Sequence, residues 1–118
     1  MNNKDIKKGN VYYANLAHYY GSEQGGYRPV LIIQNDVGNK YSQTTLVAPL
    51  TSKIAKKKLP THVHLEAGNY GLKKDSIALL EQVRVIDKNL LGDFVTSIDY
   101  EKMIEVNNAI AVSFDIAS

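Results

Sequence analysis

The sequence predicts a mainly β protein, a small β-barrel decorated with short helices. Short runs of β-branched and aromatic residues recur along the chain, separated by glycine, asparagine and aspartate. One segment, near the C-terminal end, has apolar residues at helical spacing. The 118 residues are enough for one compact core and contain no repeat or linker, so a single domain over 1–118 is expected.

The first half of the chain supplies three expected strands. Residues 10–16 are β-branched and aromatic, which favours a strand. Residues 17–28 hold three glycines within six positions and are expected to form a surface loop. A proline, tolerated at a strand start, opens the next strand at 30–35. Turn residues at 36–40 lead to a third strand at 44–50, and these two strands are expected to form a hairpin.

The second half continues with short strands and ends in a helix. Residues 62–66 alternate between polar and apolar, as a half-buried strand does. Residues 76–80 and 83–86 make one bent strand or two short ones, and a last strand covers 93–98. The helix begins after Asp99, a favourable N-cap. Its expected apolar face consists of Met103, Val106, Ile110 and Phe114.

Composition excludes several classes of protein. The chain has no cysteine, which removes disulfide scaffolds, thiolate zinc sites and cysteine nucleophiles. The longest apolar runs, such as Val30–Ile33, are too short to span a bilayer. The first residues lack the apolar stretch of a secretory signal. A soluble, cytoplasmic protein is therefore expected.

Charge is distributed unevenly along the chain. Residues 1–74 carry a formal charge of +7 and residues 75–118 carry −5, which gives the net charge of +2. Lysines concentrate near the N-terminus and again at 53–58. Such clusters hold phosphates in nucleic-acid-binding proteins, although a solvated lysine loop produces the same pattern.

Few residues in the chain suggest chemistry. The sequence lacks the phosphate-loop, zinc-protease and nucleophile-elbow motifs. Glu23 and Arg28 bracket the glycine-rich loop, and Thr51 follows the third strand. An arginine there grips a phosphate well, and a threonine hydroxyl donates to a phosphate oxygen. The alternative is structural, with Glu23 paired to Arg28 and Thr51 capping a turn.

Two histidines share one face of the strand expected at 62–66. His62 and His64 have the spacing of a zinc-binding pair, but no third ligand stands nearby in the sequence. The acidic residues are scattered among turns and strand ends, which does not favour a Mg²⁺ site. A surface strand with two imidazoles is the preferred interpretation, and no metal or other cofactor is expected.

Several blocks together resemble a known family. The segment GSEQGGYRPVLIIQND at 21–36 closely resembles the signature of the MazF/PemK toxins, which are sequence-specific endoribonucleases. KGNVY at 8–12, PTHV at 60–63 and DSIALLEQVR at 75–84 extend the resemblance over residues 8–116. The nearest likeness is to members from low-GC Gram-positive bacteria. The resemblance implies an SH3-like β-barrel with short helices and a C-terminal helix, assembled as a homodimer.

The resemblance also implies the site. The family's catalytic arginine and threonine fall on Arg28 and Thr51, and its loop acid falls on Glu23. Tyr27 stands where relatives carry various residues. The residues expected to bind RNA are Ser22, Gln24, Lys56, His62, Ser76, Glu81 and Gln82.

The implied reaction is metal-independent cleavage of single-stranded mRNA by the RNA's own 2′-hydroxyl. It gives a 2′,3′-cyclic phosphate, or a 3′-phosphate after opening, and a 5′-hydroxyl. The implied target is a U-rich pentamer of the UACAU type, and the implied inhibitor is a MazE-type antitoxin. Two alternatives remain open at this point. One is a CcdB-like gyrase-binding toxin, although this chain lacks the Trp-Gly-Ile ending of those proteins. The other is a noncatalytic SH3-like RNA-binding module.

Overall fold

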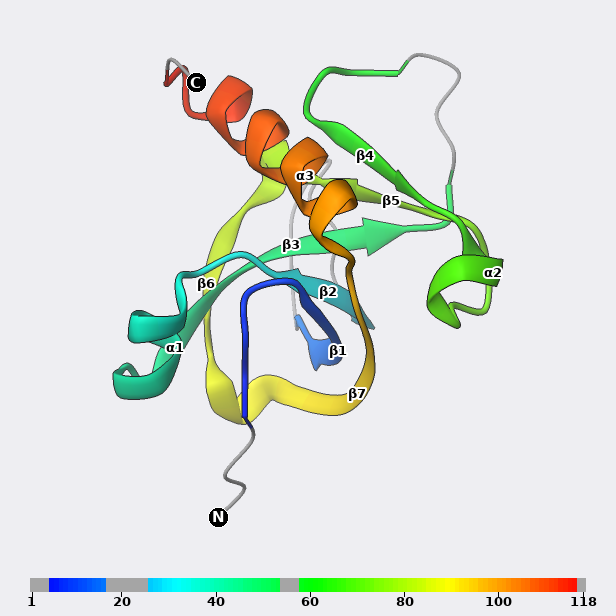
Figure 1. Cartoon of the computed structure of the whole chain (residues 1–118). Helices are drawn as coiled ribbons and strands as arrows, with labels where there is room; N and C mark the ends of the chain where they lie inside the picture. Colours follow the sequence, from blue (N-terminus) through cyan, green and yellow to red (C-terminus); the bar gives the residue numbers. More distant parts are fainter. Residues whose placement is uncertain (1–4, 17–25, 54–57, 117–118) are drawn as a thin grey trace.

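The structure is a computed structural model, and it describes residues 5–16, 26–53 and 58–116. Figure 1 shows their strands wrapped into one curved sheet with α3 across one side. The strands are β1 (Asn10–Asn15), β2 (Tyr27–Ile32), β3 (Thr44–Thr51), β4 (His62–Leu65), β5 (Ser76–Leu79), β6 (Arg84–Asp87) and β7 (Leu91–Ser97). The helices are α1 (Asp36–Tyr41), α2 (Ala67–Tyr70) and α3 (Tyr100–Ser113), with 3-10 turns η1 (Leu80–Gln82) and η2 (Lys88–Leu90).

The strands pair antiparallel in one seven-stranded sheet of order β4-β5-β3-β2-β1-β7. The long strand β3 organises it, because β5 pairs with its C-terminal end and β6 with its N-terminal half. Residues 76–87 therefore form two short strands separated by η1, one of the two predicted forms. Within the described residues β4 and β7 do not pair, so the sheet is not closed. The predicted class, mainly β with a C-terminal helix, is confirmed.

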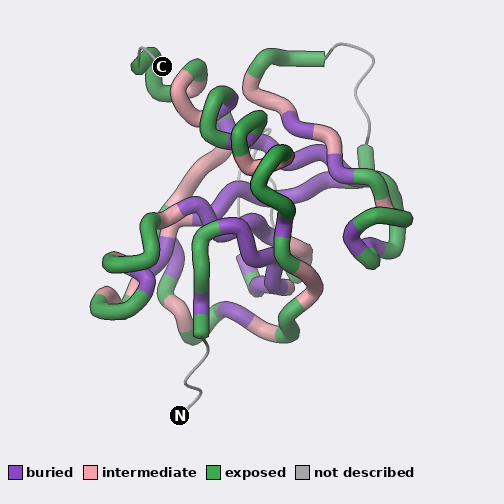
Figure 2. The backbone as a smooth tube through the Cα atoms, viewed as in Figure 1, coloured by how far each residue is buried: buried purple, intermediate pink, exposed green. Residues whose placement is uncertain are grey.

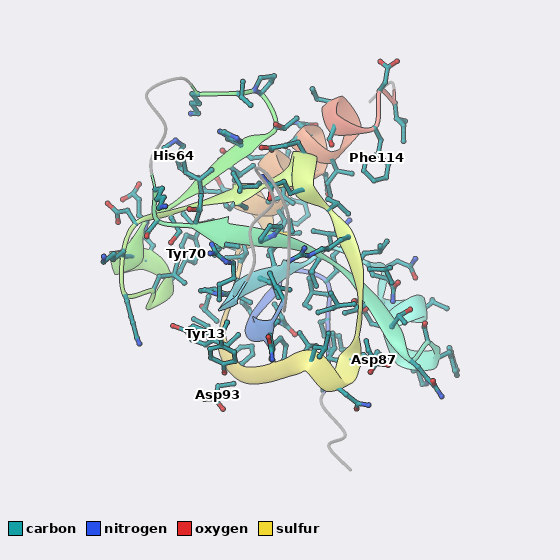
Figure 3. All side chains as sticks on the ribbon, turned by 180° about the vertical axis from the view of Figure 1, so that it is seen from behind. Tyr13, His64, Tyr70, Asp87, Asp93 and Phe114 are labelled. Atoms are coloured by element: carbon teal, nitrogen blue, oxygen red, sulfur yellow. The ribbon has the colours of Figure 1, made fainter. Side chains whose placement is uncertain are left out.

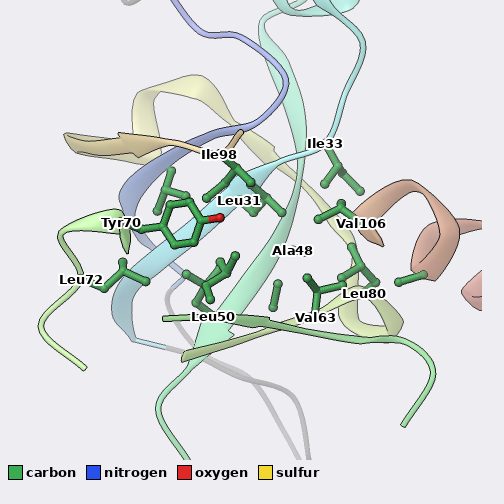
Figure 4. Packing of buried hydrophobic residues seen from close by; sticks show 14 residues of the cluster. Leu31, Ile33, Ala48, Leu50, Val63, Tyr70, Leu72, Leu80, Ile98 and Val106 are labelled. Carbon is green, nitrogen blue, oxygen red and sulfur yellow. The ribbon is translucent and has the colours of Figure 1, made fainter. Parts of the chain in front are cut away.

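Alternating side chains of the sheet bury two separate apolar clusters. Leu31, Ala48 and Leu50 point to the first cluster, which α3 covers with Val106 and Ala109. Their neighbours in sequence point to the other face, where Val30 and Val47 belong to the second cluster. Figure 2 shows that the central strands of the sheet are buried. Figure 4 shows the residues of the first cluster from close by. Each face of the sheet therefore packs against a different cluster. Because side chains alternate, the polar residues of each strand can be assigned to one face or the other.

Helix α3 begins where the sequence predicts. The side chain of Asp99 accepts a hydrogen bond from the Lys102 backbone N–H at 3.0 Å, as an N-cap does. The hydroxyl of Tyr70, a residue of α2 buried in the first cluster, donates to the same carboxylate. Burial raises the pKa of Tyr70 to about 12, and its hydrogen bond to Asp99 adds to the shift. This bond ties α2 to the start of α3, which packs against β4 and η1.

Two local predictions are wrong. Residues 36–40 form the helix α1 and not only a turn, because the side chain of Asn35 caps it by accepting from the Gly38 N–H at 2.8 Å. Asn39 in this helix is buried and accepts from the Thr45 hydroxyl at 2.7 Å, so its polar groups are satisfied. Phe114 lies just beyond α3 and is 53% exposed, so it does not belong to the apolar face of that helix.

The second strand also starts earlier than predicted. Pairing of Asn15 with Tyr27 and of Ala14 with Arg28 extends β2 back into the segment expected to be a loop. Arg28 is therefore held within a strand. Of the described helices, none is both long and apolar enough to cross a membrane.

Candidate nucleic-acid interface

Arg28 and Thr51 lie next to each other on adjacent strands. Val30 of β2 pairs with Pro49 of β3, and continuing this antiparallel register by two residues sets Arg28 opposite Thr51. Residues directly opposite in such a pair share a face, with Cβ atoms about 5 Å apart. In agreement, Nη1 of Arg28 donates to the carbonyl oxygen of Leu50 at 3.1 Å. A guanidinium and a hydroxyl from distant parts of the chain thus reach one small region.

The environment of Arg28 suits an anion. The side chain is half-buried, and this burial lowers the pKa of its guanidinium because desolvation disfavours the charged form. A partly desolvated cation attracts a phosphate more strongly than one in bulk water. Its hydrogen bond to the Leu50 carbonyl restricts the orientation of the planar guanidinium group.

Thr51 is the last residue of β3 and is 7% exposed. Its Oγ1 accepts a hydrogen bond from the Lys53 backbone N–H at 3.1 Å, which leaves the hydroxyl proton available as a donor. This turn contact agrees with the structural role considered from the sequence. Thr51 lies on the face opposite to Leu50, so its side chain does not enter the first apolar cluster.

The same face continues across two more strands. Thr51 pairs with Ile77 of β5, and Ile77 pairs with His64 of β4. Arg28, Thr51, Ile77 and His64 therefore form one row across β2, β3, β5 and β4. His62 lies on the same face, two residues from His64 along β4. This row is called the track below, and it is the candidate path for an extended ligand that starts at Arg28, although Thr51 and Ile77 within it are largely buried.

His62 is held by a carboxylate at the end of this track. Its Nε2 lies 3.1 Å from Oε2 of Glu81 in η1, and its Nδ1 accepts from the Leu59 N–H at 3.5 Å. This pattern assigns the ring proton to Nε2, which donates to Glu81. The hydroxyl of Thr61 donates to the other carboxylate oxygen at 2.9 Å. Glu81 and Gln82 belong to η1, so both stand beside β4.

Almost the whole chain matches the model of one protein family. The family model of the PemK-like, MazF-like toxins of type II toxin–antitoxin systems matches residues 7–114. The chain belongs to this toxin family. The resemblance seen in the sequence is thereby confirmed, including its lean toward low-GC Gram-positive members.

Curated relatives of this MazF-family chain are named as enzymes. Endoribonuclease EndoA of Bacillus subtilis (strain 168) is 53% identical over 108 residues, covering 92% of this chain and 93% of the relative. Endoribonuclease MazF of Staphylococcus saprophyticus is 54% identical over 111 residues, covering 94% and 92%. The crystal structure of a MazE–MazF complex from Deinococcus radiodurans (Form-II) superposes with a TM-score of 0.77 at 21% identity, covering 98% of this chain and 100% of that chain. That likeness shows the shared fold.

Not every predicted site residue of this MazF-family chain joins the row. The register puts Ser76 opposite Leu65, hence on the face opposite to Thr51 and His64. Its hydroxyl donates to the Lys74 carbonyl at 3.0 Å, and the residue is 7% exposed. Four predicted residues lie outside the described residues, namely Ser22, Glu23, Gln24 and Lys56.

Two residues of the row, Ile77 and His64, were not among the site residues predicted from the sequence. The alternation at 62–66 already put His62 and His64 on one face, but only the pairing of β4 and β5 connects that face to Thr51. Across the described residues, groups of three or more histidine, aspartate or glutamate side chains that could hold a metal ion are absent. His62 itself contacts Glu81.

Proposed function

We propose that this chain is a toxin that acts as a sequence-specific, metal-independent endoribonuclease on single-stranded mRNA. The observation that carries the proposal is the hydrogen bond from the Arg28 guanidinium to the carbonyl oxygen of Leu50, the residue before Thr51, with the β2–β3 register that sets Arg28 and Thr51 on one face when it is continued. The names of the relatives that are more than half identical support the same activity.

The reaction needs no nucleophile from the protein, because RNA carries a 2′-hydroxyl beside each phosphate. The 2′-oxygen forms a bond to phosphorus while the bond from phosphorus to the 5′-oxygen breaks. The 2′-proton passes to a base, and the leaving 5′-oxygen takes up a proton. The products are a 2′,3′-cyclic phosphate, opened afterwards to a 3′-phosphate where water attacks it, and a 5′-hydroxyl.

In this mechanism Arg28 stabilises the negative charge that builds on the nonbridging oxygens, and Thr51 donates a second hydrogen bond. Loss of one preorganised donor of this kind costs about 10²–10³ in rate. Arginine, with a reference pKa of about 12.5–13.8, is a poor general base, so its role is electrostatic. Glu23 either orients Arg28 or takes the 2′-proton.

We assign selection of the RNA sequence to residues along the track. Bases splayed out of a single strand are read by hydrogen bonds to their edges. His62, with Glu81 and Gln82 of η1, stands at the far end of the track from Arg28. The sequence-based candidates Ser22, Gln24 and Lys56 complete this set, Lys56 as a phosphate contact. The proposed target remains a pentamer of the UACAU type.

We also propose the partners that the family suggests. A MazE-type antitoxin inhibits by covering the RNA track; a MazE–MazF complex from Deinococcus radiodurans is among the solved structures that share this fold. The basic part of the chain suits the acidic tail of such a protein as well as RNA. The working form is a homodimer in the cytoplasm, where its mRNA substrate is found.

A cleavage assay with purified protein on a long RNA tests the proposal. Wild-type protein is expected to cut in excess EDTA, whereas Arg28→Ala and Thr51→Ala are expected to lose most activity. Thr96→Ala on β7 is the matched control, because Thr96 donates only a 3.5 Å bond to the neighbouring Ser97 carbonyl. Replacing the 2′-hydroxyl at the cleaved linkage by hydrogen should abolish cutting while binding survives.

Two outcomes contradict the proposal. Wild-type protein that binds RNA without cutting it would indicate a noncatalytic RNA-binding module. Protein that neither binds nor cuts RNA but binds gyrase would indicate a CcdB-like toxin.

A further inference from the structure

A stacked pair of tyrosines lies on the face of the sheet opposite to Arg28. The rings of Tyr13 and Tyr27 are 5.2 Å apart between centroids and only 9° from parallel. Tyr13 is half-buried, while Tyr27 is 60% exposed. A large aromatic side chain that is packed on one side and open on the other is poised to take a further flat ring.

The rest of the sheet holds this pair in place. Tyr13 pairs with Pro29, and Tyr27 pairs with Asn15, so the two tyrosines are diagonal neighbours on one face of β1 and β2. The hydroxyl of Tyr27 lies over the backbone of β7 at Gly92, where an added Cβ would stand 2.5 Å from the hydroxyl oxygen. A side chain at position 92 would therefore force the Tyr27 hydroxyl to shift from this position.

The charges around the pair are mixed. The ammonium of Lys73 lies 6.0 Å from the centroid of the Tyr13 ring, within the range of a cation–π contact. Asp93 is exposed and follows Gly92 on β7, in the part of that strand that lies opposite Tyr13 of β1; Figure 3 labels both residues. With one positive and one negative side chain, this surface has no net charge that would favour anions in general. The ligand that it fits presents a neutral aromatic ring together with a single charge that Lys73 can reach.

We propose that Tyr27, stacked on Tyr13, binds an unpaired nucleobase of the RNA outside the segment that is cut. The proposal rests on the endoribonuclease function proposed above. Tyr27 and Arg28 are consecutive, so their Cα atoms are about 3.8 Å apart. An RNA strand that leaves Arg28 around the end of β2 reaches the open face of Tyr27 within a few nucleotides. Stacking on an aromatic side chain tolerates any base, so this contact extends the footprint without adding sequence selectivity.

Binding of uncleavable RNA tests this contact separately from catalysis. The probes are the pentamer with a 2′-deoxy substitution at the cleaved linkage, the same RNA lengthened by a few nucleotides at either end, and lengthened versions whose added nucleotides lack bases. Tyr27→Ala should weaken binding of one lengthened RNA by about 5- to 150-fold, as loss of one stacked base does. It should leave the pentamer and the abasic probes unchanged, and Tyr27→Phe should bind as wild type does.

Tyr41→Ala is the matched control, because Tyr41 is 75% exposed on α1, away from this pair. Equal affinity of wild type and Tyr27→Ala for every lengthened RNA would overturn the proposal, as would an equal loss on the pentamer. Weaker binding of a polyglutamate peptide with unchanged RNA binding would assign the surface to an acidic protein segment and overturn it as well. Because every probe is uncleavable, failure of catalysis does not affect this result.

Discussion

Replacing Arg28 by lysine separates the charge of this residue from its geometry. Lysine keeps the positive charge but offers a single ammonium in place of a planar fork with five N–H donors. In the structure one donor of Arg28 is engaged by the Leu50 carbonyl at 3.1 Å, which orients the fork. An ammonium cannot be held in that way and still present a fixed pair of donors to a phosphate.

The size of the effect follows from the charge that develops during the reaction. Arg28→Ala removes the donor and the charge, so kcat should fall by about 10²–10³. The kcat of Arg28→Lys should lie between that of Arg28→Ala and that of the wild type. Because the interaction strengthens as charge builds in the transition state, kcat should fall far more than KM rises. Loss of the bond to Leu50 should cost about 1 kcal/mol of folding stability, so both variants remain folded at the assay temperature.

Single-turnover cleavage of a defined RNA, with thermal unfolding measured in parallel, provides the assay. If Arg28→Ala, folded as wild type is, cleaves within about tenfold of the wild-type rate, the guanidinium is not the preorganised donor and the reasoning is refuted. A lysine variant as fast as wild type would show that charge without geometry suffices.

Three further predictions concern other parts of the chain. Thr51→Val should reduce kcat by about 10²-fold while Thr51→Ser retains most activity, because only the hydroxyl is needed; equal rates for the two variants would argue against a donor role. Folding stability should fall as pH rises from about 10 toward about 12, since the unfolded chain releases the Tyr70 proton near its ordinary pKa whereas the folded chain holds it to about 12. Tyr70→Phe should flatten this part of the stability curve without changing cleavage, and an unaltered curve would contradict the assignment. Lys56→Ala should lower the salt dependence of RNA binding, with the slope of log K against log salt reduced by about one, whereas no change in slope would show that Lys56 does not touch a phosphate.

Local sequence patterns were sufficient for most of the fold. The alternation at 62–66 and the β-branched run after Asn10 predicted β4 and β1, and the cap at Asp99 predicted the start of α3. The helix α1 was missed because Asp36, Gly38 and Asn39 within it are residues typical of turns. What makes them helical is the Asn35 cap together with burial of Asn39 against Thr45, a tertiary contact.

The arrangement of the site could be predicted only in part. The family signature pointed to Arg28 and Thr51, but nothing in their spacing along the chain states that they meet. Their adjacency depends on the register of β2 against β3, which long-range packing determines. Strand register also explains why the row of residues differs from the set predicted from the sequence at two positions. His64 joins it through β5, while Ser76, one residue from Ile77, falls on the opposite face.

The most direct test of the central idea is a structure of the protein bound to RNA with a 2′-deoxy substitution at the cleaved linkage. The guanidinium of Arg28 and the hydroxyl of Thr51 are expected within about 3 Å of the nonbridging oxygens of that one phosphate. A complex in which the two side chains contact different phosphates, or in which the Thr51 hydroxyl keeps its contact with the Lys53 N–H and reaches no phosphate, would contradict this mechanism.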